Sequence, residues 1–169
     1  EEMYSAINKT VSLGKPVMTP YLIPVKHKST PCCINHPFMI NGECYKVTAM
    51  SLGSPHGVVF TDGIDGVDVQ KTGSALGAHS LFPKGASIVF TQVLDNETVK
   101  ARLWHREKGE TSYSAEAACV AGVTAMMLHR ILSDKVNVYM GDNEFLVEWN
   151  RGTNNIYLTG PADLLEINL

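Results

Sequence analysis

The sequence lacks the residue patterns that identify several classes of protein. Its net charge is −3, and it has no Lys/Arg cluster with interleaved aromatic residues, so nucleic acid is not an expected partner. Its four cysteines include no CxxC pair and no cysteine–histidine spacing typical of zinc. We therefore expect reduced thiols in a cytoplasmic protein, with no metal centre.

Long apolar segments and a secretory leader are also missing. The most apolar stretch, Ala115–Leu132, is rich in Ala and Gly and falls short of the roughly 20 strongly apolar residues that a membrane span needs. The chain opens on Glu1 and Glu2, without the basic and apolar regions of a signal peptide. The sequence predicts neither a membrane span nor a secretion signal.

Short β-forming segments dominate what is present. With 169 residues and 44% hydrophobic content, the chain can bury one core. Residues 95–97 and 141–143 have the Asn, Asp and Gly content of hairpin turns, which favours antiparallel pairing. The predicted strands, rich in Val, Ile, Tyr, Phe and Thr, are Thr10–Leu13, Tyr45–Met50, Gly57–Thr61, Ala86–Leu94, Val99–Trp104, Val136–Met140, Glu144–Trp149 and Asn155–Leu158.

One strong helix is predicted from about Ala115 to Leu132. Its first fourteen residues carry a single charge, Glu116, while His129 and Arg130 complement the helix dipole at the other end. A helix that is apolar on nearly every face must be enclosed by protein. We therefore predict an α+β fold in which a mostly antiparallel sheet curls around one central apolar helix.

Two further features complete the expected organisation. A weaker helix is predicted over Gly66–Leu76, limited by Gly73. The proline-rich residues 1–30 predict a linker strand and an extended connection, and residues 31–169 the domain itself. Where the strand ending at Trp104 leads into the long helix, free backbone N–H groups can hold an anion beside a reactive side chain, which makes this junction the candidate site.

Read together, five segments resemble the C-terminal half of the diaminopimelate epimerase family, and nearly the whole chain participates. Each match is weak alone, but the five occur in the family's order. They correspond to its linker strand, its S-M-G-N-P-H loop, its G…H…FP…F-x-Q-V pattern, its Y-E-R-G-x-G-E-T loop and its closing W…T-G-P-A segment. The segments are Val11–Pro16, Ser51–His56, Leu76–Val93, Trp104–Thr111 and Trp149 with Thr159–Ala162.

The resemblance implies an epimerase or racemase that inverts an amino-acid α-carbon without pyridoxal phosphate or another cofactor, in the pathway to lysine and cell-wall precursors. Family members place two similar domains around a small amino-acid substrate, and each domain supplies one cysteine. This sequence contains no G-N-G-x-R-C stretch, the motif that carries the first cysteine. We therefore expect half of an active site, completed by an N-terminal domain or another family subunit; a homodimer is one such arrangement.

The second family cysteine falls on Ser114, and the Gly-Thr after it falls on Ala115 and Glu116. A thiol can ionise near neutrality at a helix N-terminus, whereas a serine hydroxyl needs a separate base. Ser114 is thus either a natural loss of function or an engineered replacement. Glu116 either stabilises the helix N-terminus or contacts an ammonium or imidazolium group, and it would compete with an incoming anion.

The remaining candidate residues also come from the resemblance. His105 stands at the position of a family glutamate, and His56 keeps the histidine of the N-P-H loop, so two groups that titrate near neutrality are expected at the helix end. Arg106 keeps the arginine that faces a carboxylate. Ser54 and Ser87 replace asparagines at the distal end of the substrate.

Two other functions compete with an active epimerase half. A catalytically inactive relative would bind an amino acid or a partner subunit through the same helix end. A hydrolase reading would use Ser114 as nucleophile with His56 or His105 as base, although the G-x-S-x-G motif is missing.

Overall fold

In the computed structural model, which describes residues 8–26 and 32–166, ten strands form one sheet. The strand order is β1-β10-β9-β8-β6-β5-β4-β3-β2, with β7 paired to β6. The strands are β1 (Asn8–Gly14), β2 (His36–Ile40), β3 (Glu43–Ser51), β4 (Pro55–Phe60), β5 (Ser87–Asp95), β6 (Thr98–His105), β7 (Gly109–Thr111), β8 (Lys135–Met140), β9 (Asn143–Trp149) and β10 (Ile156–Pro161). The helical elements are η1 (Pro20–Leu22), η2 (Ile64–Gly66), α2 (Val69–Gly77), α3 (Ala115–Met127) and α4 (Ala162–Glu166).

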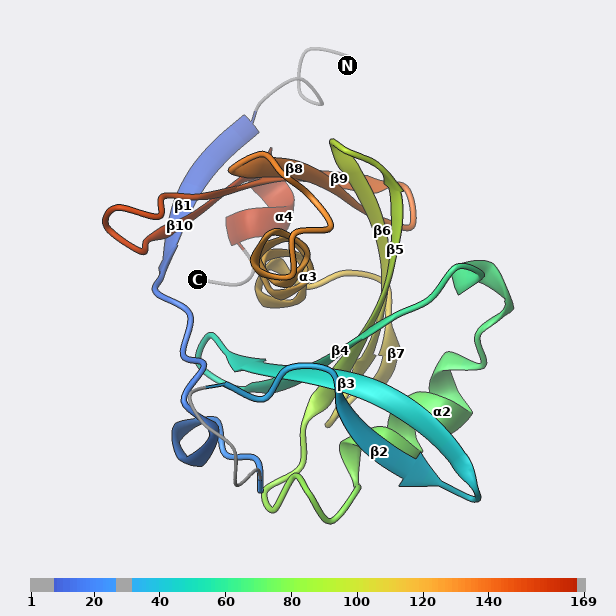
Figure 1. Cartoon of the computed structure of the whole chain (residues 1–169). Helices are drawn as coiled ribbons and strands as arrows, with labels where there is room; N and C mark the ends of the chain where they lie inside the picture. The colour runs from blue at the N-terminus through green and yellow to red at the C-terminus, as the bar shows by residue number, and fades with distance from the viewer. Residues whose placement is uncertain (1–7, 27–31, 167–169) are drawn as a thin grey trace.

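The sheet curls around α3, as Figure 1 shows, and its pairing is mostly antiparallel. Only β4 with β5 and β6 with β8 run parallel among the described strands. The predicted hairpins are confirmed, because β5 pairs with β6 and β8 pairs with β9 around the two predicted turns. The α+β class with a central apolar helix is confirmed as well.

Helix α3 is buried along almost its whole length. Every residue from Ala117 to Met126 is buried, and Glu116 is the partly exposed exception in the first turn. A methyl group added at Gly122 would lie 3.0 Å from Val136 and 3.1 Å from Val147, so the small residues let the strands approach the helix backbone closely. Close packing on all sides fixes the position of this helix, and with it the position of its N-terminal end.

The long helix ends earlier than the sequence predicts. It stops at Met127 rather than Leu132, because His129 adopts a left-handed conformation with φ of 59°. The N–H of Arg130 then bonds back to the carbonyl of Ala125 at 2.9 Å, a pattern that closes a helix C-terminus. His129 and Arg130 therefore lie just beyond the last turn, and the predicted helix is shorter than expected at this end.

The other differences from the predicted elements are a shifted helix start and two short strands that were not predicted. The second helix is present as α2, which starts at Val69 instead of Gly66. It packs against Trp104, whose side-chain atoms leave no room for a side chain at Gly73 or Gly77. Strands β2 and β7 have no counterpart among the predicted strands.

The N-terminal region joins the sheet through β1, which pairs antiparallel with β10. The predicted boundary between residues 30 and 31 lies outside the described residues. No helix in the described ranges has the length and apolar character needed to cross a membrane.

Candidate active site

Four structural elements converge at the N-terminal end of α3. The β3–β4 loop carries Ser54, and His56 lies at the start of β4, where the strand register places it beside Ser87 at the start of β5. Arg106 directly follows β6, and its backbone N–H donates to the Ser87 hydroxyl at 3.1 Å. Glu116 reaches the same region from the first turn of α3. The structure thus brings together residues that are far apart in the sequence.

Ser114 is the N-cap of α3. Its backbone is extended, with φ of −156° and ψ of 134°, and its Oγ accepts a hydrogen bond from the N–H of Ala117 at 3.1 Å. Its carbonyl accepts from the N–H of Ala118 at 2.9 Å. The Ser114 side chain therefore satisfies one backbone donor that a helix N-terminus leaves without a partner, and its carbonyl accepts the first hydrogen bond within the helix.

No described basic side chain is hydrogen-bonded to the Ser114 hydroxyl. His56 is engaged with Ser54 and Glu116, and Nδ1 of His105 accepts the N–H of Glu107 at 3.1 Å. A serine nucleophile needs a base within hydrogen-bond reach. The geometry therefore does not support the hydrolase reading.

Glu116 links the helix to the β3–β4 loop. Its Oε1 accepts a hydrogen bond from the Ser54 hydroxyl at 2.8 Å and lies 3.7 Å from Nε2 of His56. A Cβ built at Gly53, where φ is 115°, would lie 3.0 Å from Oε2, so the loop packs closely around this carboxylate. The Glu116 side chain is 30% exposed. It therefore occupies the helix end while remaining open to a ligand.

His56 is almost fully buried beside this carboxylate, with 3% of its side chain exposed. Its Nδ1 lies 3.0 Å from the carbonyl oxygen of Ser54. Burial lowers the pKa of His56, against the opposing effects of the Glu116 carboxylate and the Ser54 carbonyl, and the charges of His105 and Arg106 lower it further. The neutral ring is therefore favoured near neutrality, which suits a group that accepts a proton.

Arg106 lies at the edge of this cluster. Its guanidinium is exposed and donates through Nη1 to the carbonyl of Lys84 at 3.2 Å. Together with Lys84 and Trp104 it lines a cavity of about 500 Å³. The sequence offers no signal for this cavity, because Gly77 and Trp104, which line it, meet only when α2 packs on β6.

The buried cysteines are less acidic than a catalytic thiol needs to be. Cys119 is fully buried in α3, and burial, with a smaller contribution from Glu116, raises the pKa of its thiol. Burial also raises the pKa of Cys33, to about 11. Neither group is suited to form a thiolate near neutrality.

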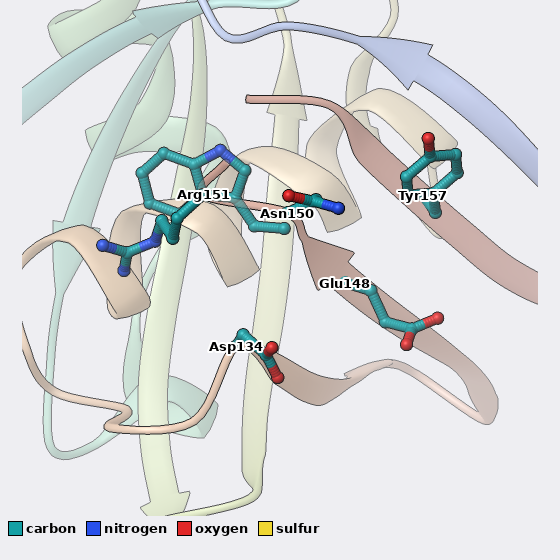
Figure 2. A pocket seen from close by; sticks show the side chains of 6 residues that line it. Asp134, Glu148, Asn150, Arg151 and Tyr157 are labelled. Carbon is teal, nitrogen blue, oxygen red and sulfur yellow. The ribbon is translucent and has the colours of Figure 1, made fainter. Parts of the chain in front are cut away.

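A second cavity, of about 410 Å³, contains none of the predicted site residues (Figure 2). Asp134, in the connection between α3 and β8, lines it together with Glu148 and Tyr157. Arg151 stacks over the Trp149 ring at 3.9 Å, so this cation already has an aromatic partner. Within the described ranges, no His, Cys, Asp and Glu side chains gather in a group that could hold a metal ion.

The chain matches known proteins over most of its length. The family model described as diaminopimelate epimerase matches residues 48–165. The diaminopimelate epimerase of Acetivibrio thermocellus is 35% identical over 152 residues, which cover 90% of this chain and 54% of that protein. The enzyme of that name from Methanococcus maripaludis is 33% identical with the same coverage. The chain thus spans about half the length of the curated relatives it matches.

Solved structures share the fold at low sequence identity. A Bacillus anthracis phenazine biosynthesis protein of the PhzF family superposes with a TM-score of 0.57 at 12% identity, covering 90% of this chain and 57% of that one. A structure from Agrobacterium radiobacter described as a probable proline racemase, with bound carbonate, gives 0.54 at 14% identity and covers 75% and 46%. These likenesses concern the fold alone.

Proposed function

This chain belongs to the diaminopimelate epimerase family, and we propose that it is the C-terminal half of an amino-acid epimerase or racemase that works without pyridoxal phosphate. In this proposal residues 31–169 are the domain, residues 1–30 are the linker, and the protein works in the cytoplasm. The observation that carries it is the convergence of the β3–β4 loop, the end of β6 and the start of α3, joined by the 2.8 Å hydrogen bond between Ser54 and Glu116.

The proposed reaction needs groups on two faces of the substrate. A base on one face removes the α-proton, the electron pair remains on carbon, and an acid on the opposite face delivers a new proton. This chain supplies one face. An N-terminal domain of the family, or another family subunit, supplies the other, and a homodimer is one arrangement that would bring two subunits together.

Each predicted residue has a part in this half-site. Arg106 holds the substrate carboxylate, with Ser54, Ser87, Ala115 and Glu116 around the rest of the ligand. Ser114 stands beside the reacting carbon at the family cysteine position, but its hydroxyl is far less acidic than a thiol. An imidazole, that of His56 or of His105, is therefore the group of this face that would move the α-proton. Diaminopimelate and the lysine pathway are the substrate and pathway that the family suggests.

Hydrogen exchange at the α-carbon tests this function. The chain is incubated with diaminopimelate or other amino acids in deuterated water, alone and mixed with the N-terminal half of the Acetivibrio thermocellus relative. We expect no exchange by the chain alone, exchange in the mixture, and faster exchange when Ser114→Cys is introduced. Exchange by the isolated chain would contradict the two-sided mechanism.

An inactive relative that binds an amino acid or a partner subunit is the second candidate. Two observations favour it: Ser114 is occupied as a helix cap, and Glu116 is already bonded to Ser54. This candidate predicts no exchange in the complemented mixture, even with Ser114→Cys. It also predicts a raised thermal midpoint with the bound amino acid, because a ligand that binds the folded state stabilises it.

A further inference from the structure

A carboxylate stands at the end of α3, where a helix N-terminus would otherwise favour an anion. Glu116 is the one charged residue of this helix, and Ser54 is the one described hydrogen-bond donor to its side chain. The outer oxygen, Oε2, lies against Gly53 and makes no hydrogen bond within the described ranges. A ligand carboxylate arriving here would meet a like charge.

A buried nitrogen faces the same carboxylate. Because the Ser54 carbonyl can only accept, the Nδ1 of His56 beside it carries the proton. In the neutral ring Nε2 is then an acceptor, and it lies 3.7 Å from Glu116 Oε1, too far for a hydrogen bond. Two acceptors thus converge, and within the described residues the Ser54 hydroxyl is the one donor between them.

We propose that Glu116 and His56 receive a primary ammonium group of the ligand, so that a cation and not a carboxylate docks at the N-terminal end of α3. This inference rests on the proposed function, since it names the class of substrate that the half-site takes. An ammonium group has three N–H donors and no acceptor, which matches a carboxylate oxygen and an imidazole nitrogen. The ligand's carboxylate is then left to Arg106.

The ammonium can come from the α-amino group of an amino acid or from the side chain of a basic one. Four probes separate these sources when the thermal midpoint of the chain is followed. Butylamine presents an ammonium alone, alanine methyl ester an α-ammonium without a carboxylate, Nα-acetyl-lysine methyl ester a side-chain ammonium without a carboxylate, and N-acetylalanine a carboxylate alone. We expect the ammonium probes to raise the midpoint and N-acetylalanine not to raise it. The tighter of the two amino-acid-derived ammonium probes identifies the source.

Substitutions of Glu116 test whether its carboxylate accounts for the binding of the ammonium probes. Glu116→Gln should weaken ammonium binding by about tenfold or more, as expected for the loss of a charged hydrogen-bond partner. Glu97→Gln is the matched control, because it removes the same charge from an exposed position in the β5–β6 turn. Glu116→Thr restores the residue type of the family motif and should shift the preference toward N-acetylalanine.

Three results would overturn the inference: tighter binding of N-acetylalanine than of the amines by the unaltered chain, equal amine affinity in the unaltered chain and Glu116→Gln, or no midpoint shift with any probe. Retained amine binding without α-proton exchange in the complemented mixture would instead refute the proposed epimerase function alone. The two failures are therefore distinguishable.

Discussion

Replacing Ser114 by alanine should destabilise the fold through loss of the α3 N-cap. The substitution removes the oxygen that accepts the Ala117 N–H at 3.1 Å and leaves that donor without its partner at the end of a buried helix. Loss of a serine cap costs about 1 kcal/mol, with a range of about 0.5–2 kcal/mol. For a chain of this size, that corresponds to a fall in thermal midpoint of about 2–4 °C.

The cap argument also predicts an order among substitutions. Ser114→Asp should keep the stability, because a carboxylate accepts the same hydrogen bond and suits the helix dipole. Ser114→Gly should lose only a few tenths of a kcal/mol. The matched control is Ser112→Ala, which removes an exposed hydroxyl two residues earlier, outside the cap.

Urea unfolding, followed by circular dichroism, measures these differences. The midpoint should fall for Ser114→Ala while the denaturant slope stays constant, which indicates a change in stability rather than in the surface exposed on unfolding. Equal midpoints for Ser114→Ala and Ser112→Ala would refute the assignment of Ser114 as a stabilising cap.

Three further predictions concern packing, pH and thiol reactivity. Gly77→Ala should destabilise the chain by about 1–3 kcal/mol in urea unfolding, because the added methyl group overlaps the Trp104 ring, whereas Gly63→Ala has open space and should be neutral. Because the pKa of His56 is lowered in the folded chain, the unfolded chain takes up a proton at this residue first, and the free energy of unfolding should fall as pH drops below 6.5. His56→Gln should flatten this pH dependence of stability. An identical pH profile for the variant and the unaltered chain would contradict the assignment to His56. Cys44 is exposed and should react with a thiol reagent in the native state, while the fully buried thiols should react only on unfolding; equal rates would contradict the described burial.

Local sequence pattern was sufficient for most elements of this fold. The hairpin turns and the start of α3 depend on neighbouring residues, so the turn residues and the start of the apolar run predicted them. The end of α3 was missed because a left-handed residue at His129, which carries a side chain unlike glycine, gives no clear local signal. Strand β2 was missed because it is an edge strand containing Pro37, and β7 because it has only three residues.

Residue types predicted which chemical groups the candidate site contains, but they did not predict the contacts between those groups. The family resemblance identified Ser54, His56 and Glu116 as candidates, yet the hydrogen bond between Ser54 and Glu116 joins residues 62 positions apart. The burial of His56 depends equally on distant packing, and so does the direction of the Arg106 guanidinium, which donates to Lys84. Residue identity sets which charges and donors are available, whereas contacts between them arise only when the curled sheet closes around α3 and excludes water from the groups it encloses.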